Sequence, residues 1–310
     1  MIALNAPDLE AIAQGPRAAF LSDDASEILH FALQSLDGGY GAALVTLVEI
    51  RGGAARAIGA QMAVREDGLY CGFVSGGCTE AAVAAEAVIA LQQGMDRNLR
   101  LGEGSPFFDI VLPCGGGITL AIHIIRAATV LRDVLAALQR RMPVRLRYHA
   151  GAQKLAFTPG EGASGWEGDC FVSAFHPKPR LFIGGTPMET GAVARVAAAS
   201  GYEVIVVERR RPISPDQLDP DTAVAILYHD IDKELPFLVC ALASPAFYIG
   251  ALGSRRTHEK RCAALRQLGY GEPELARIKA PIGIFDKAKD SNSLALSIVA
   301  DVARSRLQHH

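Results

Sequence analysis

The spacing of apolar residues predicts two α/β regions along the chain. In the first region, apolar positions recur at helical spacing over residues 23–36, and residues 42–50 are almost continuously apolar, as in a strand buried on both faces. Similar patterns predict further strands at 60–64, 69–74, 108–112, 118–125 and 143–148, and helices at 80–93 and 130–141. Residues 151–168, rich in glycine and polar residues, predict a surface loop or hairpin.

The second region predicts a strict alternation of strands and helices. Strands are expected at 181–184, 203–207, 223–227, 246–251 and around 282–284, with a closing amphipathic helix at 293–306. Buried strands that alternate with helices predict a doubly wound parallel sheet. The prolines of His176-Pro177-Lys178-Pro179 predict an extended connection. The expected fold class is α/β, with a mixed α/β domain at 1–176 and a Rossmann-like domain at 177–310.

Composition narrows the choice of partner. The 310 residues are 50% hydrophobic and 21% charged, with a net charge of −2, which gives no electrostatic reason to bind nucleic acid or an anionic membrane. The first residues show no secretion signal, and no apolar run is long enough to span a bilayer. The six cysteines form no CxxC pair. We therefore expect a cytoplasmic protein with reduced thiols.

Two cysteines lie beside glycines. Cys78 follows Gly76 and Gly77 at the start of a predicted helix, where free N–H groups and the helix dipole favour an anion or a thiolate. Cys114 precedes three glycines, a run that is entropically costly unless the backbone approaches something closely or adopts positive φ. One interpretation is a shared ligand pocket; the other is two small buried thiols beside tight turns.

Other groups in the first region have less specific patterns. Arg56 follows the glycine turn at 52–53 and is placed either to bind a phosphate or to lie solvated on the surface. The remaining four cysteines are expected to be structural, and the absence of closely spaced Cys/His pairs disfavours zinc.

In the second region, a glycine-containing turn follows the first strand, where dinucleotide folds bind pyrophosphate. Counted from Gly185, the G-x-G-x-x-G pattern has Pro187 and Thr190 in place of its second and third glycines. Proline lacks an N–H and crowds this position, which weakens a dinucleotide interpretation. Glu208, at the end of the second strand, is placed to bind a ribose, although an acid there is also ordinary at a surface.

Two later loops also follow strands. His229-Asp230 follows the third strand and Gly253-Ser254-Arg255-Arg256 follows the fourth, and open α/β sheets bind ligands at such carboxyl ends. The alternatives are a hydrogen-bonded loop histidine and a serine that caps the next helix.

Taken in order, these motifs resemble the XdhC/CoxI family, accessory proteins for the maturation of molybdenum hydroxylases such as xanthine dehydrogenase. The resemblance covers nearly the whole chain. It extends through a closing helix at 294–302 and rests on GAQM at 59–62, VSGGCTE at 74–80, LPCGGG at 112–117, YHD at 228–230, YIGALGSRRTH at 248–258 and APIG at 280–283.

The resemblance implies an accessory chaperone more than a catalyst. Such a protein would bind molybdenum cofactor (molybdopterin with molybdenum), support its sulfuration by a cysteine desulfurase, insert it into an apo molybdenum hydroxylase and form a homodimer. The thiols of Cys78 and Cys114 are soft ligands suited to molybdenum, while glycine N–H groups and arginines suit a phosphate. The expected cofactor-binding residues are Arg56, Ser75, Gly76, Gly77, Cys78, Thr79, Glu80, Cys114, Gly115, Gly116, Gly117, Gly185, Glu208, His229, Asp230, Gly253, Ser254, Arg255 and Arg256.

The chain departs from the family pattern at two places. Gly53-Ala54-Ala55-Arg56 stands where the family reads closer to Gly-Ser-x-Pro-Arg, and Pro187-Met188 stands in a turn that is nearer Gly-x-Gly-His. Two alternatives therefore remain: an NAD(P)-dependent oxidoreductase that uses the second domain, and a docking scaffold without a small ligand.

Overall fold

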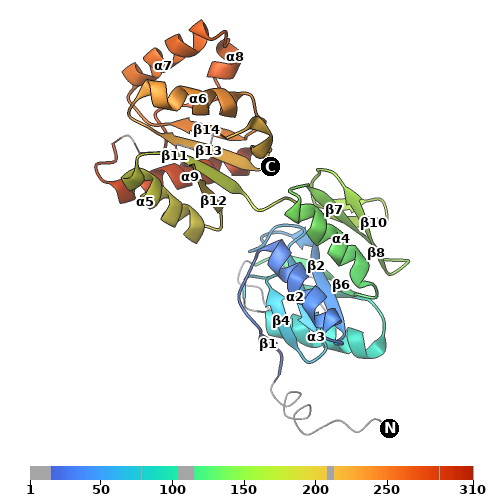
Figure 1. Cartoon of the computed structure of the whole chain (residues 1–310). Helices are drawn as coiled ribbons and strands as arrows, with labels where there is room; N and C mark the ends of the chain where they lie inside the picture. The colour runs from blue at the N-terminus through green and yellow to red at the C-terminus, as the bar shows by residue number, and fades with distance from the viewer. Residues whose placement is uncertain (1–14, 78, 104–114, 208–212, 286, 310) are drawn as a thin grey trace. The chain divides into compact units, whose positions relative to one another are not determined.

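The chain forms two compact units, Met1–His176 and Pro177–His310. The computed structural model describes residues 15–77, 79–103, 115–207, 213–285 and 287–309 (Figure 1). The first unit contains a six-stranded and a four-stranded sheet, and the second contains a five-stranded sheet.

The six-stranded sheet of the first unit has the order β1-β4-β3-β2-β6-β5. Neighbours are antiparallel except β1 and β4, which are parallel. The strands are β1 (Arg17–Ala18), β2 (Ala42–Arg51), β3 (Gln61–Arg65), β4 (Leu69–Gly72), β5 (Arg97–Gly102) and β6 (Gly117–Ile124).

Helices cover both faces of this sheet. Helices α2 (Ala25–Asp37) and α4 (Ala128–Gln139) pack on one face, where Leu44 of β2 joins their apolar core. Helix α3 (Glu80–Gln93) packs on the other face against the neighbouring residue Val45. Successive strand residues point to opposite faces, so a strand covered on both sides must be apolar at almost every position. This confirms the prediction for residues 42–50.

The four-stranded sheet has the order β8-β7-β10-β9. Its strands are β7 (Val144–His149), β8 (Lys154–Pro159), β9 (Gly165–Glu167) and β10 (Cys170–Phe175). Phe171 and Tyr148 pack against Val48 and Ala121 of the larger sheet. The predicted loop or hairpin at 151–168 thus consists largely of β8 and β9, the two edge strands. Their polar residues are tolerated because an antiparallel sheet can expose one face to water.

Besides the two-residue strand β1, the sequence analysis did not predict β5 or β10. In β5, only Leu99 and Leu101 point into the core, and the polar residues between them interrupt the apolar pattern. Such an edge strand takes its stability from pairing with β6, which the sequence does not display. The strand predicted at 108–112 lies outside the described residues.

The second unit is a doubly wound parallel sheet with the order β12-β11-β13-β14-β15, which confirms the predicted fold class. Helices α5 and α9 share an apolar core with one face, and α6, α7 and α8 share one with the other. The strands are β11 (Arg180–Gly185), β12 (Glu203–Val206), β13 (Thr222–Leu227), β14 (Tyr248–Ala251) and β15 (Ile278–Lys279). The helices are α5 (Pro187–Ala199), α6 (Ile231–Leu242), α7 (Arg255–Gln267), α8 (Glu272–Leu275) and α9 (Ser291–His309), with a 3-10 turn at Pro215–Gln217.

The last strand lies earlier than predicted. Residues 282–284 are not a strand, because this segment bonds to helix α9: the N–H groups of Ile284 and Phe285 both donate to Ser297 Oγ at 2.8 Å. Gly283 has φ +96°, and a methyl group there would lie 2.4 Å from the same oxygen. The close approach to α9 therefore requires glycine.

Four cysteines lie buried, as expected of structural thiols: Cys71, Cys170, Cys240 and Cys262. Burial raises the pKa of Cys71 to about 11, so this thiol is protonated at neutral pH. Among the helices that the structure describes, none combines the length and apolarity needed to cross a bilayer.

A buried carboxylate joins the two sheets of the first unit. The side chain of Asp96 is 5% exposed and accepts hydrogen bonds from His123 Nδ1 on β6 (2.6 Å) and the Tyr148 hydroxyl on β7 (3.0 Å). The Ile124 N–H (3.1 Å) and the Arg126 guanidinium (2.9 Å) also donate to it. Although burial raises the pKa of Asp96, the bonds from His123, Ile124 and Arg126 lower it to about 2.

We expect Asp96→Asn to lower the free energy of unfolding at pH 7 by about 2 kcal/mol, because the folded state holds the pKa below the ordinary value of 3.8. A depressed carboxyl pKa stabilises the fold fully above about pH 4, and this stabilisation is lost as the pH falls toward 2. The difference between wild type and variant should therefore shrink over this range. Urea unfolding followed by fluorescence of Trp166, the single tryptophan, reports on the first unit.

Asp37→Asn is the matched control, because Asp37 pairs with Arg132 at an exposed site. This change should cost less than about 1 kcal/mol. An Asp96→Asn penalty that stays the same from pH 7 to pH 2.5 would contradict the assignment.

Candidate functional site

Three loops of the first unit leave the six-stranded sheet at the same end. Strand β2 ends at Arg51, opposite Gly117 at the start of β6, and β4 ends at Gly72, opposite Met62 near the start of β3. The described residues 52–60, 73–77, 79 and 115–117 therefore gather at one end of the sheet, which we call the glycine-loop end.

The loop at 52–60 contacts both glycine segments. Gly76 has φ +97°, and a methyl group there would lie 3.0 Å from the Cβ of Ala55. A methyl group at Gly116 would lie 2.3 Å from the carbonyl oxygen of Gly53. These approaches are close enough to require glycine. The structure thus brings the segments next to Cys78 and Cys114 onto one loop, while both cysteines lie outside the described residues.

Glu80 holds the first glycine segment in shape. Its carboxylate is buried (1% exposed) and accepts hydrogen bonds from Ser75 N and Oγ (both 2.9 Å), Val74 N (3.1 Å) and Thr79 N (3.1 Å). Burial raises the pKa of Glu80, but the bonds from Ser75 and Gly77 outweigh it and keep the pKa below its ordinary value.

This corrects the expectation that the N–H groups before α3 are free for a bound anion. The carboxylate of Glu80 itself occupies several of them, so the anion comes from within the chain. Glu80 and Ser75 therefore shape the loop from inside.

Two donors at the glycine-loop end have no partner among the residues that the structure describes. Within that part of the chain, Thr79 Oγ1 and Arg56 Nε are buried without a hydrogen bond, although Arg56 Nη1 pairs with Asp23 at 3.1 Å. A buried polar group left without a partner costs about 1–3 kcal/mol, so such groups indicate where a ligand or water completes the structure. Arg51, in contrast, is bound to Glu49 (2.7 Å) and Thr119 (2.8 Å) within the sheet.

The remaining glycines of this end differ in role. Gly77 has φ +107° and Gly115 has φ +68°, and a methyl group added at either would meet no atom of a described residue within 4 Å. Gly117 lies against the Arg51 side chain and the Glu103 carbonyl oxygen. The positive φ of Gly77 and Gly115, rather than crowding, requires glycine at these two positions.

The second unit has a crevice at the carboxyl ends of its strands. The chain passes from β11 to β12 on one side and returns to β13 on the other, so the loops after β11 and β13 flank the switch point where open α/β sheets bind ligands. A cavity of about 680 Å³ lies here, lined among others by Glu189, His229, Gly253 and Ser254. His229 Nε2 lies 3.3 Å from Glu189 Oε1, and the other oxygen of Glu189 is buried with no partner in the described part of the chain.

Sequence reasoning missed Glu189 as the partner of His229. The neighbouring Asp230 caps α6 instead, where it accepts from Asp232 N (3.1 Å), and it pairs with Lys233 (2.6 Å), which lowers its pKa. The sheet topology could have predicted this contact, because residues just after adjacent parallel strands must lie close together.

Gly185 has a structural explanation. A methyl group at Gly185 would lie 2.6 Å from the Cβ of Leu227, so close packing of β11 on β13 requires this glycine. Glu208 lies outside the described residues.

The loop before α7 is a helix cap. Ser254 Oγ accepts from Thr257 N at 3.2 Å, which bears out the capping alternative, and Gly253 has φ +130°. Arg255 and Arg256 are exposed, and their side chains make no hydrogen bond or ion pair with a described residue. Both are therefore available to a ligand or partner.

A buried ion pair stabilises the loop before α7. Arg261 is fully buried, forms a bidentate pair with Glu234 (2.6 and 3.0 Å) and donates to the Leu252 carbonyl oxygen at 2.7 Å. Breaking such a pair by removing one member typically costs about 3–5 kcal/mol. The sequence did not predict the buried ion pair, because Arg261 lies in the middle of a polar helix.

Two α/β units, the second with a doubly wound sheet and a crevice at its switch point, define a two-domain protein with a Rossmann-like C-terminal domain. Residues 181–302 match the XdhC Rossmann domain, and residues 35–102 match the XdhC and CoxI family. The chain is 53% identical over 292 residues to the molybdenum cofactor insertion chaperone PaoD of Escherichia coli (strain K12), covering 94% of this chain and 92% of PaoD. The chain therefore belongs to the XdhC and CoxI family, as its motifs predicted.

Two more distant relatives also match most of this chain. A probable xanthine dehydrogenase subunit of Bacillus subtilis (strain 168) is 23% identical over 322 residues, covering 86% of this chain and 93% of that protein. The crystal structure of a xanthine dehydrogenase from Bacillus halodurans superposes with a TM-score of 0.73 at 20% identity, covering 93% of this chain and 97% of that one. This second likeness concerns the fold alone.

We expect Glu80→Gln to loosen the 73–79 loop, because an amide has one acceptor oxygen and no charge for the donors that converge on this site. The free energy of unfolding, followed through Trp166, should fall by about 1–3 kcal/mol. Amide hydrogen exchange at Ser75 and Thr79 should accelerate.

Glu86→Gln on the same helix is the control, because Glu86 pairs only with Arg97 at a partly exposed site. If both variants change exchange at Ser75 equally, Glu80 does not organise the loop.

Proposed function

We propose that this protein binds molybdenum cofactor as cargo and inserts it into an apo molybdenum hydroxylase of the xanthine dehydrogenase type. The observation that carries this proposal is the 53% identity to a molybdenum cofactor insertion chaperone across nearly the full length of both chains. The Bacillus subtilis relative, named as a probable xanthine dehydrogenase component, supports the class of client enzyme.

We place the cargo at the glycine-loop end of the first unit. Arg56 Nε and Thr79 Oγ1 are buried donors that no described residue pairs with, and they suit the polar pterin and phosphate groups of the cofactor. Gly77 and Gly115 leave backbone open to a ligand. The thiols of Cys78 and Cys114 supply the soft sulfur ligands that molybdenum accepts. In this proposal Glu80 is a positioning residue, and no residue of the chain acts as a catalyst.

The proposal extends to the surroundings of the protein. The cargo would be sulfurated with sulfur from a cysteine desulfurase before insertion, and the protein would act as a homodimer in the cytoplasm. The net charge of −2 supports the expectation that it binds neither nucleic acid nor a membrane. The unit at 1–176 would hold the cargo, and the Rossmann-like unit at 177–310 would offer Arg255 and Arg256 to the cofactor or to a partner.

Anaerobic cofactor retention tests the proposal. Purified protein is loaded with molybdenum cofactor and desalted, and bound pterin and molybdenum are quantified. We expect near-stoichiometric retention by wild type and at least a roughly tenfold weaker affinity in Cys78→Ala or Cys114→Ala, because a lost metal ligand removes more than 1.4 kcal/mol of binding free energy.

Cys240→Ala is the matched control, since it removes a buried thiol from the other unit and should leave retention unchanged. Retention that neither Cys78→Ala nor Cys114→Ala affects would move the site, first toward the Arg255 loop. Absence of retention would refute the chaperone function and favour a docking scaffold or a nucleotide enzyme.

One observation favours a second candidate, an NAD(P)-dependent oxidoreductase that uses the second unit. The crevice contains the unpartnered oxygen of Glu189 beside His229, and an acid near a switch point can bind a ribose hydroxyl. Pro187 is the first residue of α5, where its missing N–H would have no helical partner. The remaining argument against a dinucleotide is the bulk of its ring at the turn.

We expect neither NAD(H) nor NADP(H) to raise the melting temperature of the full chain, because Pro187 crowds the pyrophosphate turn. A saturable increase that Glu189→Gln abolishes, and that the exposed Glu259→Gln on α7 retains, would instead establish the oxidoreductase alternative.

A further inference from the structure

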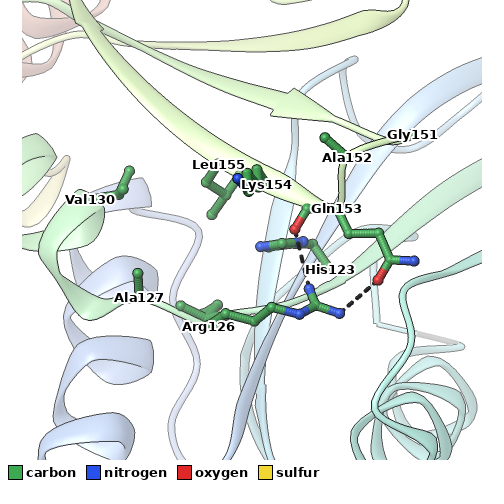
Figure 2. Close-up of a pocket in the computed structure, with 10 residues that line it drawn as sticks. His123, Arg126, Ala127, Val130, Gly151, Ala152, Gln153, Lys154 and Leu155 are labelled. Atoms are coloured by element: carbon green, nitrogen blue, oxygen red, sulfur yellow. Dashed lines mark hydrogen bonds between the residues drawn. The ribbon is translucent and has the colours of Figure 1, made fainter.

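A separate pocket lies at the opposite end of the six-stranded sheet. Strand β6 runs from Gly117 at the glycine-loop end to Ile124, a span of about 25 Å. The pocket opens just beyond Ile124 and has a volume of about 450 Å³. It is lined by His123 of β6, residues 125–127 between β6 and α4, Val130 in the first turn of α4, the turn at 151–153 and the start of β8 (Figure 2). None of the described residues that line this pocket belongs to the sequence motifs or to the proposed cargo site.

His123 presents a nitrogen without a partner to this pocket. Its side chain is 6% exposed and lines the cavity, and its Nδ1 lies 2.6 Å from Asp96. An ionised carboxylate can only accept, so Nδ1 carries the proton of this bond. Nε2 has no hydrogen bond to any residue that the structure describes. A ring nitrogen that faces a cavity from an otherwise buried side chain is available to a polar group of a ligand.

Positive groups surround this nitrogen. Lys154 lines the pocket, is exposed, and forms no ion pair with a described residue. Helix α4, 12 residues long, begins at the pocket with Ala127 as its N-cap, and it has neither a side-chain cap nor an acidic residue in its first turn. The positive end of the helix dipole is therefore not neutralised locally.

The acid nearby is already compensated. Asp96 accepts from His123 Nδ1 and pairs with Arg126 at 2.9 Å. Arg126 also donates to Gln153 Oε1 at 2.7 Å (Figure 2). None of the described residues that line the pocket is acidic. The field inside the pocket is thus positive, and an anion meets no uncompensated like charge.

The walls of the pocket are apolar. Ile125, Val130, Ala152 and Leu155 line it together with the polar groups. Inorganic ions gain nothing from such walls, whereas an apolar body on the ligand would remove this surface from water.

We propose that this pocket binds a small organic anion, a carboxylate or phosphate ester on a short apolar body, with its anionic group between His123 Nε2, Lys154 and the start of α4. The site is independent of the proposed function, because it lies at the other end of the sheet from the glycine loops. The two proposals can therefore fail separately.

Ring NMR of histidine-labelled full-length protein tests the site, with phenyl phosphate, hexanoate, inorganic phosphate and phenol as probes. The His123 signal is assigned by its loss in His123→Gln. We expect a saturable shift of this signal with phenyl phosphate or hexanoate, and the stronger of the two identifies the anionic group. Inorganic phosphate should bind at least about tenfold more weakly, and phenol should cause no saturable shift.

Variants decide between a built site and incidental binding. Lys154→Gln should weaken the organic anion at least about tenfold. Lys260→Gln, an exposed lysine on α7, should not. Ala152→Trp fills the pocket from an exposed turn and should abolish the shift even if His123→Gln fails to fold. Retention of molybdenum cofactor by Lys154→Gln should equal that of wild type.

No saturable shift with either organic anion would overturn the proposal. The same holds if phenol binds as tightly as the anions, if Lys154→Gln and Lys260→Gln behave alike, or if folded Ala152→Trp still binds.

Discussion

Burial of the six-stranded sheet on both faces is the constraint on which the first unit depends. Helices α2 and α4 cover one face of β2 and α3 covers the other, so its central positions are mostly apolar. The exception, Thr46, is buried and accepts a hydrogen bond from Gln61 Nε2. The polar groups of both candidate sites lie at the two ends of the sheet. The glycine loops occupy one end, and the His123 pocket occupies the other.

Each end is organised by a carboxylate that the fold removes from water. Glu80 gathers the N–H groups of the 73–79 loop, and Asp96 ties β6 to β7 and to the turn at 151–155. Both have lowered pKa values because hydrogen bonds to the charged form outweigh the penalty of burial. A network that satisfies its carboxylate fully is rigid, since any departure leaves a buried charge unpaired.

The second unit uses buried charge in the same way around its crevice. Arg261 and Glu234 support the loop before α7, while Asp301 on α9 accepts from the Tyr248 hydroxyl (2.7 Å) and from Gly283 N (3.2 Å). These bonds hold two of the loops that line the crevice. Only at Glu189 is a carboxylate oxygen left without a partner there, among the residues that the structure describes.

The sequence by itself determined what depends on local pattern. Periodicity and turn chemistry involve residues close together in the chain, so they can be recognised in the sequence. They predicted the apolar run of β2, the strand–helix alternation of the second unit, the Ser254 cap and the ordered family motifs. Tertiary structure decided the rest. It placed His229 next to Glu189 rather than Asp230, and it brought Asp96 to His123. It also buried Arg261. At the expected anion site before α3, it placed the carboxylate of Glu80. Each of these depends on which loops the sheet order brings together and on how completely packing excludes water, and neither is contained in the spacing of residues along the chain.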